Sequence, residues 1–540
     1  MSESATVARR CLELITEAGV PRLFGIPGVH NLAFWRDWSD EMPPIVGVRH
    51  EQTTVYAADG LARATGGLGV ALTTTGPGAA NAAGAFGEAA AAKSPVVLIA
   101  SEVATRFTTD TRMKGVLHQS RDQAGIFEPL AKAVFRPRTA QDAVSAVREA
   151  IACALSAPRG PVYVDIPTDV LSLPAEALDP PAPEPRLTAR ADQIEAAQRL
   201  LGQSERAVIW CGGGVVQSGA EEELVRLAEV LDAPVVTTYA ARGVVPPEHP
   251  SHVALPPHEP EIAGLVGAAD LLFAIGTDFD GMMTRNWSMP MPPGLITVNC
   301  DADDLTKNYA PDVAVQGDAR EVLRALLEGL EAAEGGASHV AGVEAGWARL
   351  RTDATERPGI EFVASIDSAI EPEHVVVCDM AVAGYWYGGY GRVLRARQLQ
   401  YPVGWGTLGF ALPAAIGPAS VGTPTLAICG DGGVMFALSE LATVAQESLP
   451  VTLLVVDDGA YGMLAYDQEV AGDPRAGVDL VSPDWEALGQ AFGIPTTMTS
   501  PAGQDLGESV RAALATRKPA LVVHKASFVP PRTTSARWAE

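Results

Sequence analysis

Short, continuous runs of apolar residues alternate with amphipathic or alanine-rich stretches along the whole chain. Uninterrupted apolar runs bounded by Gly, Pro or Asp are typical of strands buried on both faces of a parallel sheet. The stretches between them are long enough to be helices that cross from one strand to the next. The predicted strands lie within residues 69–76, 94–101, 160–167, 206–214, 233–240, 270–277, 294–300, 374–380, 423–432, 450–458 and 519–526.

Two segments interrupt this alternation and predict boundaries between domains. Leu178–Asp192 is rich in proline, and Glu331–Gly342 is small and polar, as exposed linkers are. We therefore expect three doubly wound α/β domains with mainly parallel sheets, at residues 1–178, 190–332 and 350–530. Such sheets bind ligands beyond the carboxyl ends of their strands, so functional residues are expected there.

Composition narrows the range of functions. The 540 residues carry a formal net charge of −26 and contain no basic run, which argues against nucleic-acid binding. The six cysteines are scattered without a C-x-x-C pair, so neither a zinc site nor a disulfide framework is expected. No signal peptide and no apolar run long enough for a membrane span is recognised, so we expect a cytoplasmic protein with no membrane partner.

Acidic residues follow two strands of the last third. Asp431 lies in a Gly-Asp-Gly-Gly turn at the end of the segment 423–432, and Asp457 and Asp458 end the strand at 450–458. If these strands are parallel neighbours, the carboxylates meet at one sheet edge, where oxygen ligands suit Mg²⁺. Alone, the glycine turn could be purely structural, and the pairing with the second strand is what favours a metal site.

This spacing resembles the thiamine-diphosphate-binding motif of the acetolactate synthase and pyruvate decarboxylase superfamily. The family usually ends the motif in two Asn residues, whereas this chain has Asp457 and Asp458. The resemblance implies that Mg²⁺ is held by Asp431, Asp458 and the carbonyl of Ala460. It also implies that the diphosphate and the thiazolium ring are surrounded by Gly432, Gly433, Tyr461, Gly462 and Met463.

The first third carries the sequence RHEQTTVYAADG followed by TTTGPGAAN, which resembles the pyrimidine-binding domain of the same superfamily. By itself, Glu51 at the start of a helix could simply interact with the helix dipole. The resemblance instead makes Glu51 the glutamate that hydrogen-bonds the pyrimidine ring, with Pro77 and Asn81 in the pocket. That bond favours the imino tautomer, which forms the C2 ylid; the ylid attacks a 2-oxo acid and an enamine follows loss of CO₂.

A third match precedes the metal motif in the sequence VGWGTLGFALPAAIG. By resemblance, Leu408 is the apolar wedge under a bent cofactor and the Gly406 carbonyl accepts from the 4′-amino group. Leu408 could equally be an ordinary core residue. The loop at Met380, Ala381, Val382 and Ala383 matches the segment that approaches the diphosphate.

Candidate residues for the substrate lie in two loops of the first third. GVLHQSRDQAG resembles the loop that supplies an aromatic residue and a glutamine in acetolactate synthase-like enzymes, which places His118 and Gln119 there. His30 lies at the mouth of the first domain and is a second candidate. A histidine can donate a proton or hold a carboxylate near neutral pH, but each could also be an ordinary loop residue.

Taken together, these features predict a lyase or transferase that uses thiamine diphosphate and Mg²⁺ on a small 2-oxo acid. It would act without oxidation, as a decarboxylase or as an acyloin-forming carboligase. An FAD-containing oxidase of the same fold and a non-catalytic relative are the alternatives; the glycines at 212–214 are a weak dinucleotide signal, so FAD is not expected. In the family, Glu51 and the metal motif meet across a dimer interface, so a homodimer or homotetramer is implied.

Overall fold

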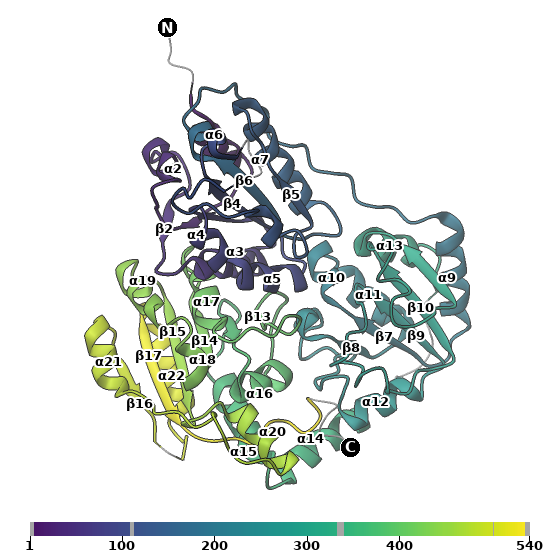
Figure 1. Cartoon of the computed structure of the whole chain (residues 1–540). Helices are drawn as coiled ribbons and strands as arrows, with labels where there is room; N and C mark the ends of the chain where they lie inside the picture. Colours follow the sequence, from purple (N-terminus) through teal and green to yellow (C-terminus); the bar gives the residue numbers. More distant parts are fainter. Residues whose placement is uncertain (1–4, 109–112, 332–339, 501, 535–540) are drawn as a thin grey trace.

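In the computed structural model, which describes residues 5–108, 113–331, 340–500 and 502–534, three parallel sheets form three α/β domains (Figure 1). Every paired strand within these sheets runs parallel to its neighbours. The fold class expected from the alternating apolar runs is therefore confirmed.

The N-terminal domain contains a six-stranded sheet with the order β2-β1-β3-β4-β6-β5. Its central strands are fully buried, as the continuous apolar runs required. Its strands are β1 (Leu23–Gly25), β2 (Ile45–Gly47), β3 (Gly69–Thr73), β4 (Val96–Glu102), β5 (Ala133–Phe135) and β6 (Val162–Pro167). Its helices are α1 (Val7–Glu17), α2 (Leu32–Asp37), α3 (Glu51–Thr65), α4 (Pro77–Asn81), α5 (Ala83–Ala91), α6 (Thr105–Thr108), α7 (Ala140–Leu155) and α8 (Thr168–Leu171), with a 3₁₀ turn, η1, at Ala124–Ile126.

The central domain contains a five-stranded sheet with the order β11-β10-β9-β7-β8. The strands are β7 (Ala207–Cys211), β8 (Val235–Thr237), β9 (Leu271–Ile275), β10 (Gly294–Asn299) and β11 (Val313–Gln316). The helices are α9 (Ala191–Gln203), α10 (Gly213–Ser218), α11 (Glu221–Leu231), α12 (Pro260–Gly267) and α13 (Ala319–Leu327), and a 3₁₀ turn, η2, spans Tyr239–Ala241.

The C-terminal domain contains a six-stranded sheet with the order β13-β12-β14-β15-β17-β16. The strands are β12 (Val375–Cys378), β13 (Leu399–Gln400), β14 (Thr425–Gly430), β15 (Val451–Asp457), β16 (Thr496–Met498) and β17 (Ala520–Lys525). The helices are α14 (Val340–Thr352), α15 (Arg357–Asp367), α16 (Val382–Tyr390), α17 (Ala411–Ala419), α18 (Asp431–Val434), α19 (Leu441–Gln446), α20 (Gly462–Ala471), α21 (Trp485–Phe492) and α22 (Leu506–Ala515), with a 3₁₀ turn, η3, at Leu438–Glu440.

The two predicted linkers differ in how the structure describes them. Residues 178–190 form neither helix nor strand, and α9 begins at Ala191. In the second linker, residues 332–339 lie outside the described part of the chain, and α14 already begins at Val340, so its last residues are helical. The domain limits at 1–178, 190–332 and 350–530 stay predictions.

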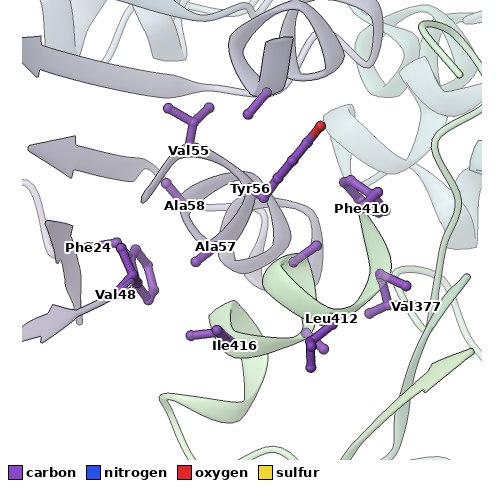
Figure 2. Packing of buried hydrophobic residues seen from close by; sticks show 14 of the residues in the cluster. Phe24, Val48, Val55, Tyr56, Ala57, Ala58, Val377, Phe410, Leu412 and Ile416 are labelled. Atoms are coloured by element: carbon purple, nitrogen blue, oxygen red, sulfur yellow. The ribbon is translucent and has the colours of Figure 1, made fainter. Parts of the chain in front are cut away.

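Helices α3 and α17 hold the N-terminal and C-terminal domains together, as Figure 2 shows from close by. Tyr56 of α3 packs edge-on against Phe410 beside α17, with ring centroids 5.5 Å apart. A Cβ atom on Gly60 would lie only 2.1 Å from the carbonyl oxygen of Ala414, so only glycine allows the two backbones to approach so closely. This crossing fixes the start of α3, where Glu51 lies, relative to the C-terminal domain.

Within the described part of the chain, no helix combines the length and the apolar character that crossing a membrane requires.

Candidate functional site

Strands β14 and β15 bring the two acidic segments of the C-terminal domain together. They are parallel neighbours, and Gly430 at the end of β14 pairs in register with Val456 of β15. Asp431 therefore follows one strand and Asp458 the next at the same sheet edge. Asp431 is also the first residue of α18, where the N–H groups of the turn are available to an anion.

The carboxyl groups of Asp431 and Asp458 are hydrogen-bonding neighbours, and the ionisation of one affects the other. Asp431 is 2% exposed, and its Oδ1 atom accepts no hydrogen bond from any residue that the structure describes. Burial, followed by the charge of Asp457, raises the pKa of Asp431 above its usual range. Burial and the charge of Asp431 raise the pKa of Asp458 to about 7. Two buried carboxyl oxygens without a cation form an electrostatically unfavourable pair, and a divalent cation would relieve it.

Asp457 has a different role from its neighbour. Its Oδ1 accepts from the Ser482 hydroxyl at 2.5 Å, and its Oδ2 accepts from the Trp485 indole N–H at 2.8 Å. Both oxygens therefore anchor the segment that leads into α21. The family resemblance had named Asp458 rather than Asp457 as the metal ligand, and in the structure Asp458 is the carboxylate that interacts with Asp431.

A cavity of about 170 Å³ opens beside this carboxyl pair and is lined entirely by residues of the C-terminal domain. A Cβ atom on Gly462 would lie 2.2 Å from Oδ2 of Asp458, so a larger residue there would displace the Asp458 carboxylate. Thirteen of the expected cofactor residues line the cavity: Met380, Ala381, Val382, Ala383, Gly406, Leu408, Gly432, Gly433, Asp458, Ala460, Tyr461, Gly462 and Met463. Residues that sequence reasoning had not assigned to the cofactor complete the wall: Tyr385, Gly430, Val456, Leu464, Ala526 and Phe528.

Asp379 organises this cavity and was also missed from the sequence. It follows β12, is fully buried, and accepts backbone N–H bonds from Met380 at 2.9 Å and Gly409 at 3.0 Å. Burial raises its pKa to about 7, although those N–H donors favour the charged form. By holding both loops, Asp379 sets the positions of Met380 and Leu408. Its place after a buried strand, like that of Asp431, is a signal that could have identified it.

Glu51 lies in the N-terminal domain, at the first position of α3. Its Oε2 accepts from the Asn81 amide at 2.9 Å, so two of the residues predicted to contact a pyrimidine are already paired. Gly78 follows Pro77, and a Cβ atom there would lie 3.4 Å from Oε1 of Glu51. Glu51, Pro77 and Asn81 thus form one small cluster, and none of them lines the C-terminal cavity.

The two candidate histidines lie close together, next to the turn that begins at Gly76. The rings of His30 and His118 make an edge-to-face contact with centroids 5.4 Å apart. Gly76 has a positive φ of 65°, and a Cβ there would lie 2.5 Å from the carbonyl oxygen of His118. Burial, and then the charge of His118, lower the pKa of His30. Gln119 has a different contact: its Oε1 accepts the N–H of Lys114 at 2.9 Å, within its own loop.

A larger cavity of about 460 Å³ lies where the three domains meet. Glycine turns after β7 and β9 form one side, and a Cβ atom on Gly212 would lie 2.2 Å from the carbonyl oxygen of Gly276. Arg159, Arg397 and Lys93 are among the residues that line it.

Comparison with known proteins agrees with these three domains. Residues 5–126 match the N-terminal TPP-binding domain of thiamine pyrophosphate enzymes, residues 194–326 match their central domain, and residues 379–524 match their C-terminal TPP-binding domain. A probable acetolactate synthase large subunit of Methanocaldococcus jannaschii is 31% identical over 95% of this chain and 91% of its own length. A probable 2-ketoarginine decarboxylase of Pseudomonas aeruginosa is 32% identical over 94% of this chain and 91% of its own. An acetolactate synthase of Mycobacterium avium is 33% identical over 91% of this chain and 82% of its own. The chain therefore belongs to the thiamine-diphosphate-dependent enzymes of the acetolactate synthase and decarboxylase superfamily, which form or cleave carbon–carbon bonds.

Proposed function

We propose that this enzyme uses Mg²⁺ and thiamine diphosphate, without oxidation, to decarboxylate a small 2-oxo acid or to join its acyl group to an acceptor. The observation that carries the proposal is the buried Asp431 Oδ1, which accepts no hydrogen bond from any described residue and lies beside Asp458. The residues fit the metal, because Mg²⁺ prefers oxygen ligands and no cationic side chain in the described part of the chain lowers the pKa of either carboxyl group.

Each end of the cofactor has its own set of residues. Asp431, Asp458 and the carbonyl of Ala460 would hold Mg²⁺ and, through it, the diphosphate, while the α18 N-terminus offers N–H groups to the anion. Glu51 would hydrogen-bond the pyrimidine and hold or release a proton there. When bound, the cofactor supplies a nucleophilic carbon and an electron sink for the bond next to the substrate carbonyl.

The separation of these two sets supports sites formed between two chains. The cavity beside Asp458 has no wall from the N-terminal domain, and Glu51 does not line it. Large apolar side chains are exposed on both domains, including Leu117 at 64%, Phe436 at 53% and Leu464 at 52%. Exposed apolar surface of this kind is often covered in an oligomer. A homodimer, alone or within a homotetramer, would bring Glu51 of one chain to the metal end of the other.

The His30–His118 pair supports a 2-oxo acid as the substrate. The Nδ1 atoms of both rings are buried and find no hydrogen-bond partner among the described residues, so each ring keeps an unused polar atom. A neutral imidazole can orient a carboxylic group or return a proton to carbon after CO₂ leaves. Proton return favours decarboxylation, whereas an apolar acceptor pocket beside Leu464 and Phe528 would favour carboligation.

The test is to incubate the purified protein with thiamine diphosphate and a panel of 2-oxo acids, with and without Mg²⁺, and to follow CO₂ and acyloin separately. We expect Mg²⁺-dependent CO₂ release from at least one acid. Glu51→Gln should lower that rate by about 10²–10⁴-fold. Full activity of Glu51→Gln would contradict the role of Glu51. Calorimetry that detects no cofactor binding in the presence of Mg²⁺ would favour a non-catalytic relative.

The 460 Å³ cavity favours one alternative specifically, namely an FAD-containing oxidase of the same fold. Its glycine turns at strand ends and its four basic side chains, Arg63, Lys93, Arg159 and Arg397, are of the kind that approach a nucleotide diphosphate. A visible absorption spectrum distinguishes the two proposals, because bound flavin colours the purified protein yellow. A colourless protein that turns over a 2-oxo acid would support the non-oxidative enzyme.

A further inference from the structure

Glu440 is a buried carboxylate of the C-terminal domain that contacts the segment carrying Glu51, and we infer that it is the positioning residue for that glutamate. The inference rests on the proposed role of Glu51. Glu440 ends the 3₁₀ turn η3, downstream of the Asp431 turn, and none of its surface is exposed.

The contacts of Glu440 reach the two residues immediately before Glu51. Its Oε1 accepts the backbone N–H of Arg49 at 3.0 Å and that of His50 at 3.0 Å. Its Oε2 accepts the hydroxyl of Thr443 at 2.6 Å, so both oxygens are used as acceptors. Backbone N–H groups that precede a helix have no partner within it, and a buried one needs an acceptor from elsewhere.

The same C-terminal segment also holds the other side of Glu51. The Gln52 side-chain amide donates to the carbonyl oxygen of Phe436 at 2.8 Å, and the guanidinium of Arg49 donates to Gln446 at 2.6 Å. Residues 49, 50 and 52 are therefore all tied to residues 436–446. Because these bonds cross from one domain to the other, they fix the position of Glu51 relative to the C-terminal domain. A helix cap within the N-terminal domain would fix only where α3 begins.

A carboxylate suits this position better than an amide does. Its two oxygens can accept all three donors, whereas a glutamine offers one acceptor oxygen and turns an NH₂ group toward the remaining partner. A glutamine could still accept the two backbone N–H groups with its oxygen and donate its NH₂ group to Thr443, because the Thr443 hydroxyl can rotate to accept. We therefore expect Glu440→Gln to position Glu51 partly. A nonpolar side chain should lose the contacts both with the backbone N–H groups and with Thr443.

Glu440 makes no contact with the C-terminal cavity, and its effect on chemistry must pass through Glu51. A misplacement of about 1 Å at a catalytic group can lower a rate by about 100-fold. The step that Glu51 controls is best followed as hydrogen–deuterium exchange at C2 of bound thiamine diphosphate, in the full-length protein with Mg²⁺ and no substrate.

The central domain offers a matched control in Asp270. Its carboxylate accepts the backbone N–H of two consecutive residues, Glu205 at 2.9 Å and Arg206 at 3.1 Å, and also the hydroxyl of Ser204. It thus has the same kinds of donors as Glu440, but it lies in another domain and is only half-buried. Asp270→Asn should lower the unfolding temperature, by no more than Glu440→Gln does, while leaving C2 exchange within about twofold of the wild type.

The experiment compares Glu440→Gln, Glu440→Leu, Thr443→Val, Asp270→Asn and Glu51→Gln by C2 exchange, cofactor affinity and thermal unfolding. We expect exchange to fall about 100-fold in Glu440→Leu and about tenfold in Glu440→Gln, with the cofactor Kd changed less than about threefold. If Glu440→Leu fails to fold, Glu440→Gln and Thr443→Val still report on the contact.

Near-normal exchange in folded Glu440 variants, or a Kd that changes as much as exchange does, would overturn the inference. If instead Glu51→Gln itself exchanges normally, the proposed role of Glu51 fails, and the two failures are thereby distinguished.

Discussion

Replacing Asp458 with Asn should remove the pH dependence that the Asp431–Asp458 carboxyl pair imposes on the protein without cofactor. Burial and the charge of Asp431 raise the pKa of Asp458 from 3.8 to about 7. Asn keeps the shape and an oxygen ligand but has no proton to lose. The substitution therefore separates the charge of the second carboxylate from its geometry.

The size of the effect follows from the shift. A change of about three pKa units corresponds to at most ~4 kcal/mol between the protonated and ionised states. Because Asp458 is only partly buried, solvent screening reduces this, and we use about 2 kcal/mol. In a domain of this size, about 2 kcal/mol shifts the unfolding temperature by roughly 4–8 °C.

The sign follows from comparing the folded and unfolded chains. The folded protein keeps a proton on the pair at a pH where the unfolded chain has released it, so that proton contributes stability. This contribution is complete below about pH 4 and is lost as the pH rises through about 7. The unfolding free energies of wild type and Asp458→Asn should thus be most similar near pH 4. Above pH 7 the variant should be the more stable of the two.

The assay is thermal unfolding of the cofactor-free protein between about pH 4.5 and 8.5, together with calorimetric titration of Mg²⁺ in the presence of thiamine diphosphate. In the wild type, Mg²⁺ must displace the shared proton, so its affinity should fall about tenfold per pH unit below pH 7. In Asp458→Asn that slope should flatten. Equal pH slopes in both proteins, for unfolding and for Mg²⁺ affinity, would refute the reasoning.

Two further predictions concern the domain contact and the histidine pair. Gly60→Val should destabilise the protein by about 3 kcal/mol or more, because its Cβ would lie 2.1 Å from the Ala414 carbonyl oxygen. Gly84→Ala, where a Cβ meets nothing within 4 Å, should leave the unfolding temperature unchanged or slightly raised; equal losses in both variants would contradict this account. His118→Asn should raise the pKa of His30 toward its ordinary value, because one of the two causes that lower it is removed. NMR titration of the His30 ring checks this, and an unchanged or lowered pKa would show that the pair is not coupled.

The long buried strands were predictable from the sequence, whereas most of the short ones were not; the three-residue β8 is an exception. Strands such as β4 and β15 consist of seven buried residues and appear as continuous apolar runs. Strands β2 and β13 have three and two residues, too few to form a pattern. Their positions are set by the neighbouring strand, which is information that no local window contains.

The candidate site shows the same division. Asp431 and Asp458 could be found because the carboxyl ends of adjacent parallel strands meet, and Asp379 could have been found by the same rule. Glu440 could not, because it lies in a short 3₁₀ turn, and its partners Arg49 and His50 are nearly four hundred residues away. Nor could the sequence show that both carboxylate oxygens of Asp457 accept hydrogen bonds, one from Ser482 and one from Trp485.

The central claim is that Glu51 of one chain and Asp431 of another act on one cofactor, and subunit mixing tests it most directly. Glu51→Gln and Asp431→Asn are each expected to be inactive alone. In a heterodimer of the two, one site would combine both substitutions, and the other would have an intact Glu51 and an intact Asp431. Mixing equal amounts under exchange conditions should therefore restore about a quarter of wild-type activity. Activity that stays at the level of the separate variants, with heterodimers shown to form, would contradict the account.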